Sequence, residues 1–482
     1  MGGSVSEPWT GRRLHFVGVG GAGMSGYVRA AHALGAEVSG SDRADSPYLE
    51  RLRADGVLEA SIGHAATNLP AGEDVEVVYS SAVPPDNAER RAARERGLRE
   101  RARAELLGEL SALRRTIAVA GTHGKTTTSS MLVHALRAAG FDPGWLVGAP
   151  VGGGLPNAHW SEGEWLVVEA DESDRSMLSL AVEIAVLSNV ELDHHASFAS
   201  LAELREAFRA FLARARRAVV VWDRPELIEL TPGEVEVVPY DVPAPALTAG
   251  GSRWHWRGHD VTLAVPGAHN ALNAAAALEA ARLTGADLER AIAGLAVFPG
   301  AGRRFQLVGV TTAGASVYDD YAHHPTEVAA TVRAARTLDP RRLVAVFQPH
   351  LYSRTALLAR EFGDALALAD AAAVLDVYPA RERAEDHPGV SGLTIAQTTA
   401  DAAAGRPVMW LPTFADALPV LRGLLGEGDL CLVMGAGDVD ALSRCLVADA
   451  ADADALPSRL VADAGDVDAL SRGVAEHAGG DR

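Results

Sequence analysis

The segment TIAVAGTHGKTTTSSM, residues 116–131, holds the residues best suited to binding phosphate. The apolar run 117–119 predicts a buried strand and 129–139 predicts a helix, and between them lie Gly121, Thr122, His123, Gly124, Lys125, Thr126 and Thr127. In such a turn, glycines let backbone N–H groups converge on phosphate oxygens, the helix N-terminus adds about half a positive charge, and the lysine adds a mobile full charge. Thr126 would place its hydroxyl on a magnesium ion that bridges the phosphates. We therefore predict a nucleoside triphosphate site of the short form GTHGKT, the alternative being a glycine-rich turn that binds no ligand.

Acidic residues and histidines follow the next two apolar runs. The run WLVVEA leads into EADESD, residues 169–174, and the run IAVLSNV leads into ELDHH, residues 191–195. In an open α/β sheet, ligands bind beyond the carboxyl ends of the strands, so both stretches should lie beside the phosphates that Lys125 holds. Carboxylate and imidazole groups there suit a second magnesium ion, which would neutralise a transferring phosphoryl group. The alternative is a solvated acidic loop.

A second glycine turn lies near the N-terminus. Residues 18–23, GVGGAG, end the apolar run 14–19 and precede a predicted helix, and Asp42 stands 19 residues beyond Gly23. At that spacing a carboxylate meets a ribose in a dinucleotide fold. Such a turn recognises only the diphosphate of its ligand. It therefore predicts that a nucleotide diphosphate binds here, but it does not identify the nucleotide as NAD.

The last third of the chain carries arginines and histidines in loops after predicted strands. Arg303 and Arg304 suit a planar bidentate grip on phosphate or carboxylate. The stretches DDYAHHPTE, residues 319–327, and QPHLYSRT, residues 348–355, each follow an apolar run. Pro325 is well placed to open a helix.

Strands and helices alternate throughout the chain. The pattern predicts an α/β fold of three domains: an N-terminal Rossmann-like domain, a central P-loop ATPase-type domain and a C-terminal Rossmann-like domain. One predicted helix starts at His269 and Asn270, whose side chains could hydrogen-bond a base edge or cap the helix. The predicted boundaries are a flexible leader over 1–13, domains over 14–115, 116–299 and 300–446, and an acidic, repeat-containing tail over 447–482.

The composition is that of a globular protein, with 48% hydrophobic and 22% charged residues among 482. The net charge of −19 argues against non-specific nucleic-acid binding, so we expect no nucleic-acid partner. Cys431 and Cys445 lack a CxxC spacing and indicate reduced thiols in a cytoplasmic protein. Because no apolar leader and no run of about 18 apolar residues occurs, we expect no membrane association. We expect a monomer or a weak homodimer.

Nine motifs, in their order along the chain, resemble those of the bacterial Mur ligases: GVGGAGMSG, SGSD, AGTHGKTTT, EADESD, NVELDH, HNALNAAAA, GRRF, DDYAHHPTE and FQPHLYSRT. The likeness runs from residue 14 to residue 438 and leaves the leader and tail uncovered. GTHGKT marks the ATP-dependent amide ligases, and GVGGAGM, EADESD and FQPHLYSRT narrow the resemblance to the alanine-adding branch.

The resemblance implies an enzyme of peptidoglycan precursor synthesis that ligates L-alanine to the lactyl carboxylate of UDP-N-acetylmuramate, with ATP and Mg²⁺ as cofactors. ATP would phosphorylate the carboxylate, and the alanine amine would attack the resulting acyl phosphate. Because no enzyme nucleophile is needed, the protein would contribute positioning and charge stabilisation.

The resemblance also implies a role for each matching residue. Lys125 and Thr126 would hold the ATP phosphates and magnesium, and Glu169 and His194 would ligate the magnesium. Asn270, with His269 beside it, would contact the adenine of ATP. Arg304 would contact the phosphates, and Asp320 would contact the ribose. The UDP group would lie on Gly20, Gly21, Ala22, Gly23 and Asp42. The groups bordering the lactyl carboxylate and alanine would be His323, His350 and Arg354, which join Lys125, His194 and Arg304 as the catalytic set.

Two positions depart from the family pattern. His195 follows His194 where the family more often has an apolar residue, and it is either a second metal ligand or only a neighbour. Ala322 replaces a common glycine, which is a small change. The alternatives are the murein-peptide recycling ligase, a folate-type glutamate ligase, and a nucleotide-binding regulatory protein without turnover. An NAD dehydrogenase would leave the second phosphate loop unexplained.

Overall fold

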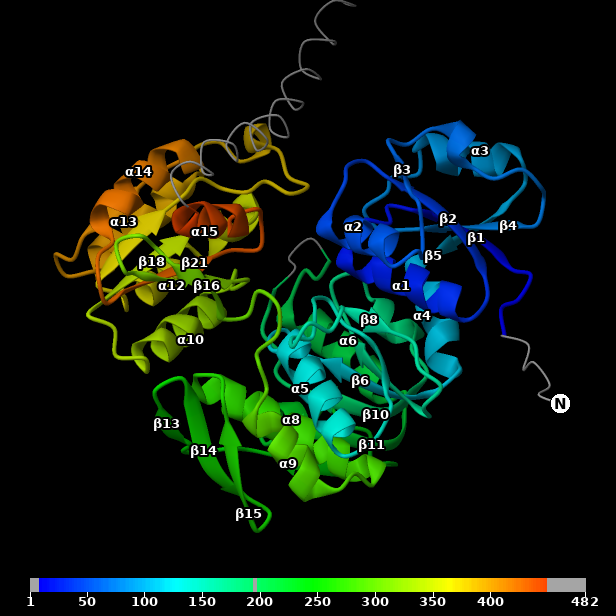
Figure 1. Cartoon of the computed structure of the whole chain (residues 1–482), viewed down its shortest axis with the longest axis horizontal. Coiled ribbons are helices and arrows are strands. Elements are labelled where there is room, and N and C mark those ends of the chain that lie inside the picture. The colour runs from blue at the N-terminus through cyan, green and yellow to red at the C-terminus, as the bar shows by residue number, and fades with distance from the viewer. Residues whose placement is uncertain (1–7, 194–196, 449–482) are drawn as a thin grey trace, which may run out of the picture. The chain divides into compact units, whose positions relative to one another are not determined.

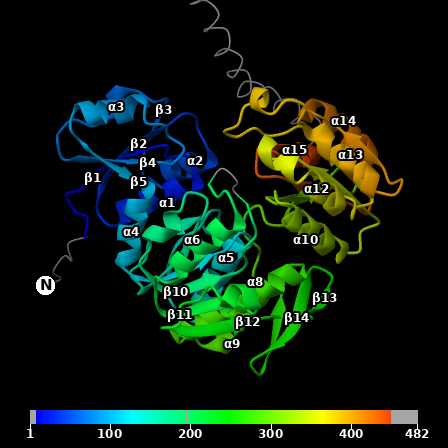
Figure 2. The same ribbon diagram turned by 180° about the vertical axis from the view of Figure 1, so that it is seen from behind.

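The computed structural model describes residues 8–193 and 197–448 of the chain, which Figures 1 and 2 show from two sides. The chain divides into two compact units, Met1–Gly302 and Arg303–Arg482. His194, His195 and the predicted tail from residue 449 onward lie outside the described residues.

The first unit begins with a five-stranded parallel sheet in the order β3-β2-β1-β4-β5 (Figure 1). Its strands are β1 Arg13–Val17, β2 Glu37–Asp42, β3 Ser61–Ile62, β4 Val75–Tyr79 and β5 Arg99–Ala102. The accompanying helices are α1 Ala22–Ala33, α2 Pro47–Ala54, η1 Ala66–Asn68, α3 Ala88–Glu95 and α4 Arg103–Ala112. In the central strand β1, every residue after Arg13 is buried, because a parallel sheet is covered on both faces.

Packing of the chain begins before the expected leader boundary at residue 13. The indole of Trp9 is buried in the core of this sheet, with 5% of the residue exposed. Arg12 lies over the Trp9 ring and pairs with Glu76 at 2.9 Å and Glu109 at 3.0 Å. These contacts fix the residues immediately before β1.

The central sheet has seven strands in the order β12-β11-β10-β6-β9-β7-β8, all parallel except β8. Its strands are β6 Arg115–Ala120, β7 Gly144–Leu146, β8 Ala158–His159, β9 Trp165–Glu169, β10 Val182–Leu187, β11 Ala215–Trp222 and β12 Glu236–Tyr240. The helices are α5 Lys125–Ala138, η2 Ser176–Ser179, α6 Leu201–Leu212, α7 Pro225–Ile228, α8 Ala268–Thr284 and α9 Leu288–Ala296. An antiparallel sheet follows β12, with strands β13 Ala246–Thr248, β14 Gly251–Trp256 and β15 His259–Leu263.

Strand β6 separates two cores because successive side chains of a strand point to opposite faces. Ile117 and Val119 pack with residues of α5, α8 and α9, whereas Ala118 and Ala120 pack on the face that α6 covers. All four side chains are fully buried. The loop after β6 is therefore held by a strand that is buried on both faces.

The second unit contains a six-stranded sheet in the order β16-β17-β21-β18-β19-β20, parallel except for the edge strand β16. Its strands are β16 Gln306–Val310, β17 Ser316–Asp320, β18 Arg342–Phe347, β19 Ala371–Val374, β20 Val408–Trp410 and β21 Asp429–Met434. Its helices are α10 Pro325–Arg336, α11 Tyr352–Leu357, α12 Ala359–Leu366, η3 Ala384–Asp386, α13 Gly392–Ala402, α14 Phe414–Leu424 and α15 Asp440–Val447. Pro325 is the first residue of α10, which confirms the predicted helix start.

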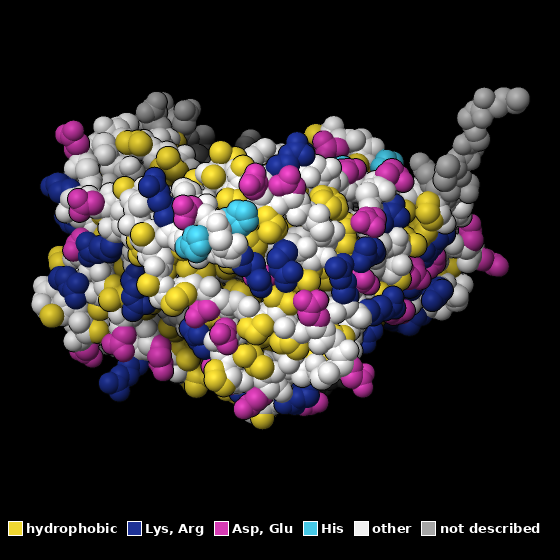
Figure 3. Space-filling view, turned by 90° about the horizontal axis from the view of Figure 1, so that it is seen from below, with side chains coloured by type: hydrophobic (Ala, Val, Ile, Leu, Met, Phe, Trp, Pro, Cys, Tyr) yellow, Lys and Arg dark blue, Asp and Glu magenta, His cyan; other side chains and the backbone are white. Residues whose placement is uncertain are grey.

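The observed α/β architecture with parallel sheets is the predicted fold class, and one helix start differs from its prediction. Helix α5 begins at Lys125 rather than near residue 129, because Gly124 adopts a left-handed conformation and ends the loop there. Within the described residues, no helix has the length and apolar character needed to cross a membrane. On the face shown in Figure 3, Lys and Arg side chains are interspersed with Asp and Glu.

Candidate functional site: a phosphate loop and its acidic neighbours

The predicted phosphate loop lies between β6 and α5, at the carboxyl end of β6. Gly121 has φ 136° and Gly124 has φ 81°, conformations that residues with a Cβ rarely adopt. A Cβ at Gly121 would collide with Ser188 Oγ, and one at Gly124 would lie 2.6 Å from Asn273 Oδ1. Both glycines are therefore required by backbone conformation and by close neighbours.

Residues that follow β10 hold the loop in place. Asn189 accepts a hydrogen bond from His123 N–H at 2.8 Å and donates one to His123 O at 3.0 Å. Ser188 Oγ also donates to His123 O, at 2.7 Å, and Thr122 Oγ1 donates to Glu191 O at 2.9 Å. The sequence indicated that this stretch lies beside the loop, but Ser188 and Asn189 were not identified as its supports.

Lys125 is buried and lies between the loop and the acidic stretch after β9. Its Nζ is 2.8 Å from Glu172, and it donates to Gly121 O at 2.7 Å and Thr122 O at 3.1 Å. Burial lowers the pKa of Lys125, but the nearby Glu172 and Asp171 raise it more, so the net shift is upward. The loop therefore holds a fully charged ammonium group.

Thr126 and Glu169 form the oxygen pair expected for magnesium. Thr126 Oγ1 lies 3.0 Å from both carboxylate oxygens of Glu169, and Gly148 N–H donates to Glu169 Oε2 at 2.7 Å. A hydroxyl and a carboxylate are hard oxygen ligands of the kind Mg²⁺ prefers, so these residues fit the ion. His194, the other predicted ligand, is one of the residues that the structure does not describe.

The residues predicted to meet the adenine lie at the start of α8, near the loop. Gly267 occupies the N-cap position of α8, so neither His269 nor Asn270 is the N-cap residue. Asn270 is buried, and its Nδ2 donates to Pro266 O at 2.7 Å. Asn273, one helical turn further, connects this region to the phosphate loop through its contact at Gly124.

The predicted diphosphate turn precedes α1, and Asp42 lies beside it. Asp42 Oδ2 accepts a hydrogen bond from Gly20 N–H at 2.6 Å, and Ser46 Oγ donates to Gly20 O at 2.9 Å. Helix α1 starts at Ala22 and has neither a side-chain cap nor an acidic residue in its first turn. Its first N–H groups are thus suited to an anion.

A buried carboxylate that sequence reasoning missed supports this region. Glu89 is fully buried and accepts hydrogen bonds from His15 at 2.9 Å, Ser41 at 2.7 Å and Asn68 at 2.8 Å. Burial raises the pKa of Glu89, but these hydrogen bonds lower it to about 2. Ser41 precedes Asp42, so this network fixes the end of β2.

In the second unit, Asp320 ends β17 and is buried. Its two oxygens accept hydrogen bonds from Phe305 N–H and Ala322 N–H, both at 2.7 Å. Burial raises the pKa of Asp320 to about 6 despite the nearby charge of Arg304. The carboxyl group is therefore close to its titration range near neutral pH.

The two arginines expected to grip an anion differ in their environments. Arg303 pairs with Asp319 at 3.0 Å and donates to Gly435 O at 2.9 Å and Gly437 O at 3.1 Å. Arg303 therefore ties β17 to the loop after β21 rather than presenting its guanidinium to a ligand. Arg304 lies over the Tyr321 ring, 4.8 Å from its centroid.

His323, His350 and Arg354 come together in the second unit. The rings of His323 and His350 lie 6.1 Å apart, and Arg354 Nη1 is 3.3 Å from His350 Nδ1. An arginine can only donate, so His350 Nδ1 is the acceptor. His323 Nδ1 lies 2.9 Å from Tyr321 O, which can only accept, so the neutral ring carries its lone pair on Nε2.

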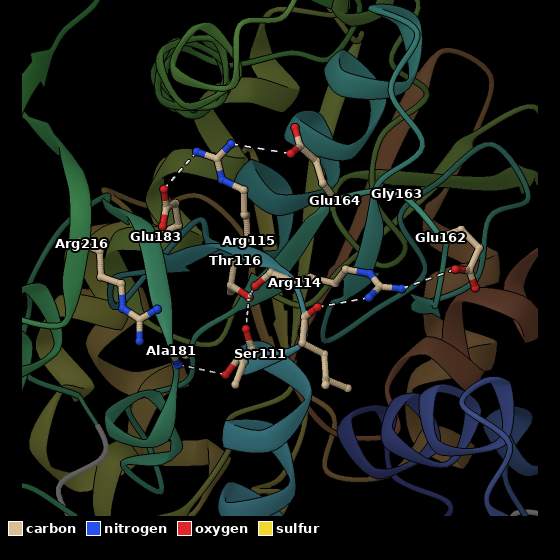
Figure 4. Close-up of a pocket in the computed structure, with 12 residues that line it drawn as sticks. Ser111, Arg114, Arg115, Thr116, Glu162, Gly163, Glu164, Ala181, Glu183 and Arg216 are labelled. Atoms are coloured by element: carbon tan, nitrogen blue, oxygen red, sulfur yellow. Dashed lines mark hydrogen bonds and ion pairs between the residues drawn. The ribbon is translucent and has the colours of Figure 1, made fainter. Parts of the chain in front are cut away.

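A cavity of about 590 Å³ lies at the opposite end of the central sheet (Figure 4). Its lining includes Arg115, the first residue of β6, whereas the phosphate loop follows Ala120, the last. Arg115 pairs there with Glu183 at 3.0 Å and Glu164 at 3.7 Å. This cavity is separate from the phosphate loop.

Three family models match the chain. They are described as the Mur ligase family catalytic domain over residues 13–115, the Mur ligase middle domain over 119–281, and the Mur ligase glutamate ligase domain over 303–437.

Similar proteins include UDP-N-acetylmuramate–L-alanine ligases. That of Mycolicibacterium smegmatis is 43% identical over 91% of this chain and 95% of its own, and that of Saccharopolyspora erythraea is 44% identical over 89% and 91%. The crystal structure of a UDP-N-acetylmuramate–alanine ligase from Thermotoga maritima covers 90% of this chain and 98% of its own, with TM-score 0.76 and 25% identity. A murein peptide ligase from Psychrobacter arcticus shares the fold over 90% of this chain and 98% of its own, with TM-score 0.67 and 23% identity.

The matches agree with the geometry described above. The middle-domain match spans the phosphate loop with Glu169 and Glu172, and the C-terminal match spans Asp320, His350 and Arg354. The identity to the two relatives extends over nearly the whole of each chain. This chain belongs to the Mur ligase family.

Proposed function

We propose that this chain ligates L-alanine to the lactyl carboxylate of UDP-N-acetylmuramate and converts ATP to ADP and phosphate, in peptidoglycan precursor synthesis. The observation that carries the proposal is the phosphate loop, in which Lys125 and Thr126 each face a carboxylate, at 2.8 Å and 3.0 Å. The names of relatives at 43–44% identity support the choice of substrates. A cytoplasmic location and a monomeric or weakly dimeric state remain expectations from sequence.

The chemistry requires activation because a carboxylate is a poor electrophile. The lactyl carboxylate attacks the γ-phosphorus of ATP, which forms an acyl phosphate and releases ADP. The amine of L-alanine then attacks the acyl carbon, the amide bond forms, and phosphate leaves with its electron pair. Lys125 balances the negative charge of the transferred phosphoryl group.

Magnesium, when bound, neutralises phosphate charge, and Thr126 and Glu169 would hold it. His194 as a further ligand rests on the sequence. Asn270 with His269 would meet the adenine. The UDP group would occupy the turn from Gly20 to Gly23 beside Asp42.

The second unit supplies the remaining groups of the proposal. Arg304 would reach the phosphates and Asp320 the ribose, while His350 and Arg354 would border the carboxylate and alanine. His323 is suited to accept a proton from the alanine ammonium because its Nδ1 lies 2.9 Å from a carbonyl, which leaves Nε2 as the basic nitrogen. If so, His323→Ala should change the pH dependence of the rate as well as its size.

Phosphate release with UDP-N-acetylmuramate and a panel of amine substrates tests the assignment. The panel contains L-alanine, glycine, L-serine and the tripeptide L-alanyl-γ-D-glutamyl-meso-diaminopimelate. Highest kcat/KM with L-alanine supports the proposal, and preference for the tripeptide would instead indicate a recycling ligase. Phosphate release with none of them would contradict a ligase function.

Isotope transfer tests the acyl-phosphate route separately. With oxygen-18 in the lactyl carboxylate, one labelled oxygen should pass to the released phosphate, because the carboxylate oxygen that attacks phosphorus leaves with it. Unlabelled phosphate alongside normal product formation would exclude this route.

A further inference from the structure

The residues that begin helix α15 occur twice in this chain. Residues 437–444, GDVDALSR, return without change as residues 465–472. The first copy covers the loop before α15 and the first residues of the helix. The second copy lies outside the described residues, so the repeat is known from the sequence. The chain thus carries a second segment with the residues that place α15 on its neighbours.

Helix α15 packs on β16, β17, β21 and α14, which together form what we call the α15 surface (Figure 1). Val439, Ala441 and Leu442 are buried there, with at most 3% of each residue exposed. Val439 and Leu442 belong to the apolar core that also contains Cys431 of β21. The apolar side chains of the repeated octapeptide are therefore the ones that α15 buries.

Polar contacts at the start of α15 also use repeated residues. Arg303 donates to Gly437 O at 3.1 Å and lies 3.9 Å from Asp440. Gln348 donates to Asp438 at 2.8 Å. The corresponding residues of the second copy are Gly465, Asp466 and Asp468. The second copy thus has the same groups for both the apolar and the polar contacts with the α15 surface.

The two copies diverge after the octapeptide, and α15 has the better residues. Its Cys445 and Leu446 are buried, and the residues at these positions of the second copy are Gly473 and Val474. Smaller side chains fill less of the core, and glycine disfavours a helix. The second copy is therefore the weaker occupant, which agrees with the position of α15 on this surface in the structure.

The second copy can reach the α15 surface of its own molecule. Residues 448–464 separate it from α15, and 17 residues span up to roughly 55 Å when extended. The eight residues of α15 span only about 12 Å. A tethered segment also meets its site at an effective concentration in the millimolar range, which exceeds that of a second molecule in a micromolar solution.

We propose that the α15 surface has a second occupant, residues 465–478 of the same chain, which takes the place of α15 when that helix leaves the surface. Elements of a folded protein open locally, and an open α15 would expose the core that contains Cys431. The second copy would cover this core again. The inference goes beyond the proposed function and does not depend on ligase activity.

The two cysteines of the chain report which segment occupies the surface, because Cys445 lies in α15 and Cys431 in the core that α15 covers. Both are buried, so both should react slowly with a thiol reagent in the full-length parent. Leu442→Asp should release α15 and speed the labelling of Cys445 by about tenfold or more, while Cys431 stays protected by the second copy. Adding Leu470→Asp should expose both cysteines, and Leu470→Asp alone should label like the parent.

Equal labelling of Cys431 in Leu442→Asp and in the double variant would overturn the proposal, because the second copy would then protect nothing. Protection of Cys431 that disappears on dilution would also overturn it, since the occupant would come from a second molecule. The matched control is Leu421→Asp in α14, which perturbs the same core outside the repeat. Adding Leu470→Asp to this control should leave its labelling unchanged.

A second pair of variants keeps the test decisive if Leu442→Asp unfolds the second unit. Ser443→Pro breaks α15 as a helix without placing a charge in the core, and Ser471→Pro does the same to the second copy. Cys431 should stay protected in Ser443→Pro and become reactive when Ser471→Pro is added. Equal reactivity of Cys431 in these two chains would overturn the proposal.

Discussion

Replacing Lys125 by methionine removes the ammonium group that lies 2.8 Å from Glu172. The side chains are 12% and 1% exposed, so the carboxylate would lose its cation in a place that water barely reaches. Two unit charges at this distance attract with roughly 6 kcal/mol at an effective dielectric constant of about 20. Desolvation of both groups offsets much of this attraction.

The expected loss of stability is therefore smaller than the attraction. Removing one partner of a buried pair costs about 3–5 kcal/mol, and we expect Lys125→Met to lower the free energy of unfolding by an amount in this range. Glu172→Gln should cost about 1–3 kcal/mol, since the amide still accepts a hydrogen bond. The double variant should be less destabilised than the sum by about 1–3 kcal/mol.

Urea unfolding followed by tryptophan fluorescence measures this coupling, because Trp145 and Trp165 lie in the core of the central sheet. Phosphate release measures function in parallel, and Lys125→Met should lower it by about 10³-fold or more. A coupling energy under about 0.5 kcal/mol would refute the mutual compensation of Lys125 and Glu172. Substantial turnover by Lys125→Met would refute the role of Lys125 in phosphoryl transfer.

Three further perturbations test single features of the sites. Thr126→Val removes a hydroxyl at nearly constant volume, so half-maximal phosphate release should require about tenfold more Mg²⁺. Thr126→Ser keeps the hydroxyl and should behave like the parent. An unchanged Mg²⁺ titration for the valine variant would exclude the hydroxyl as a ligand. Gly124 and Gly154 have similar φ angles, 81° and 78°, so replacing either by alanine should lower the free energy of unfolding by about 1–2 kcal/mol. Of these two glycines, Gly124 has a close neighbour, Asn273, and Gly154 has none. In a calorimetric titration, therefore, Gly124→Ala should lose ATP binding and Gly154→Ala should keep it. The pKa of Asp320 is about 6 in the folded chain against an ordinary 3.8, so the folded chain binds the proton of this carboxyl group more tightly than the unfolded chain does. The resulting stabilisation is complete below pH 3.8 and is lost as the pH rises through 6. The difference amounts to roughly 3 kcal/mol, and Asp320→Asn should remove that decline from a stability–pH curve of the second unit; an identical curve for the variant would contradict a raised pKa.

Most of the phosphate site follows from local sequence. A glycine turn with Lys-Thr between a buried strand and a helix needs no distant partner to be recognised, and EADESD and ELDHH follow their strands directly. Because parallel strands end at the same edge of a sheet, the proximity of these three stretches could be predicted. The order β10-β6-β9 brings both acidic stretches to the strand that carries the loop.

The choice of partner within each stretch could not be predicted. EADESD offers four acids, and only the backbone path after β9 places Glu172 on Lys125, Glu169 on Thr126 and Asp174 on Arg103. Glu89 and His15 are 74 residues apart, so their buried contact carries no local signal. Arg303 and Arg304 are adjacent and chemically identical, and only the position of Asp319 shows that Arg303 serves the fold.

The pairing of Lys125 with Glu172 also keeps a buried phosphate-binding lysine in its charged form. Burial favours the neutral amine, and a neutral Lys125 could not balance phosphoryl charge. Glu172 and Asp171 keep the pKa of Lys125 raised, so the cation stays charged inside the protein. The same carboxylate then competes with an incoming phosphate for Nζ, which lowers affinity in the ground state. An interaction raises the rate most when it is stronger in the transition state than in the ground state. A lysine that also pairs with a carboxylate binds the ground-state phosphate less tightly than a lysine bound to phosphate alone, so more of its interaction is reserved for the charge that develops on the transferred group.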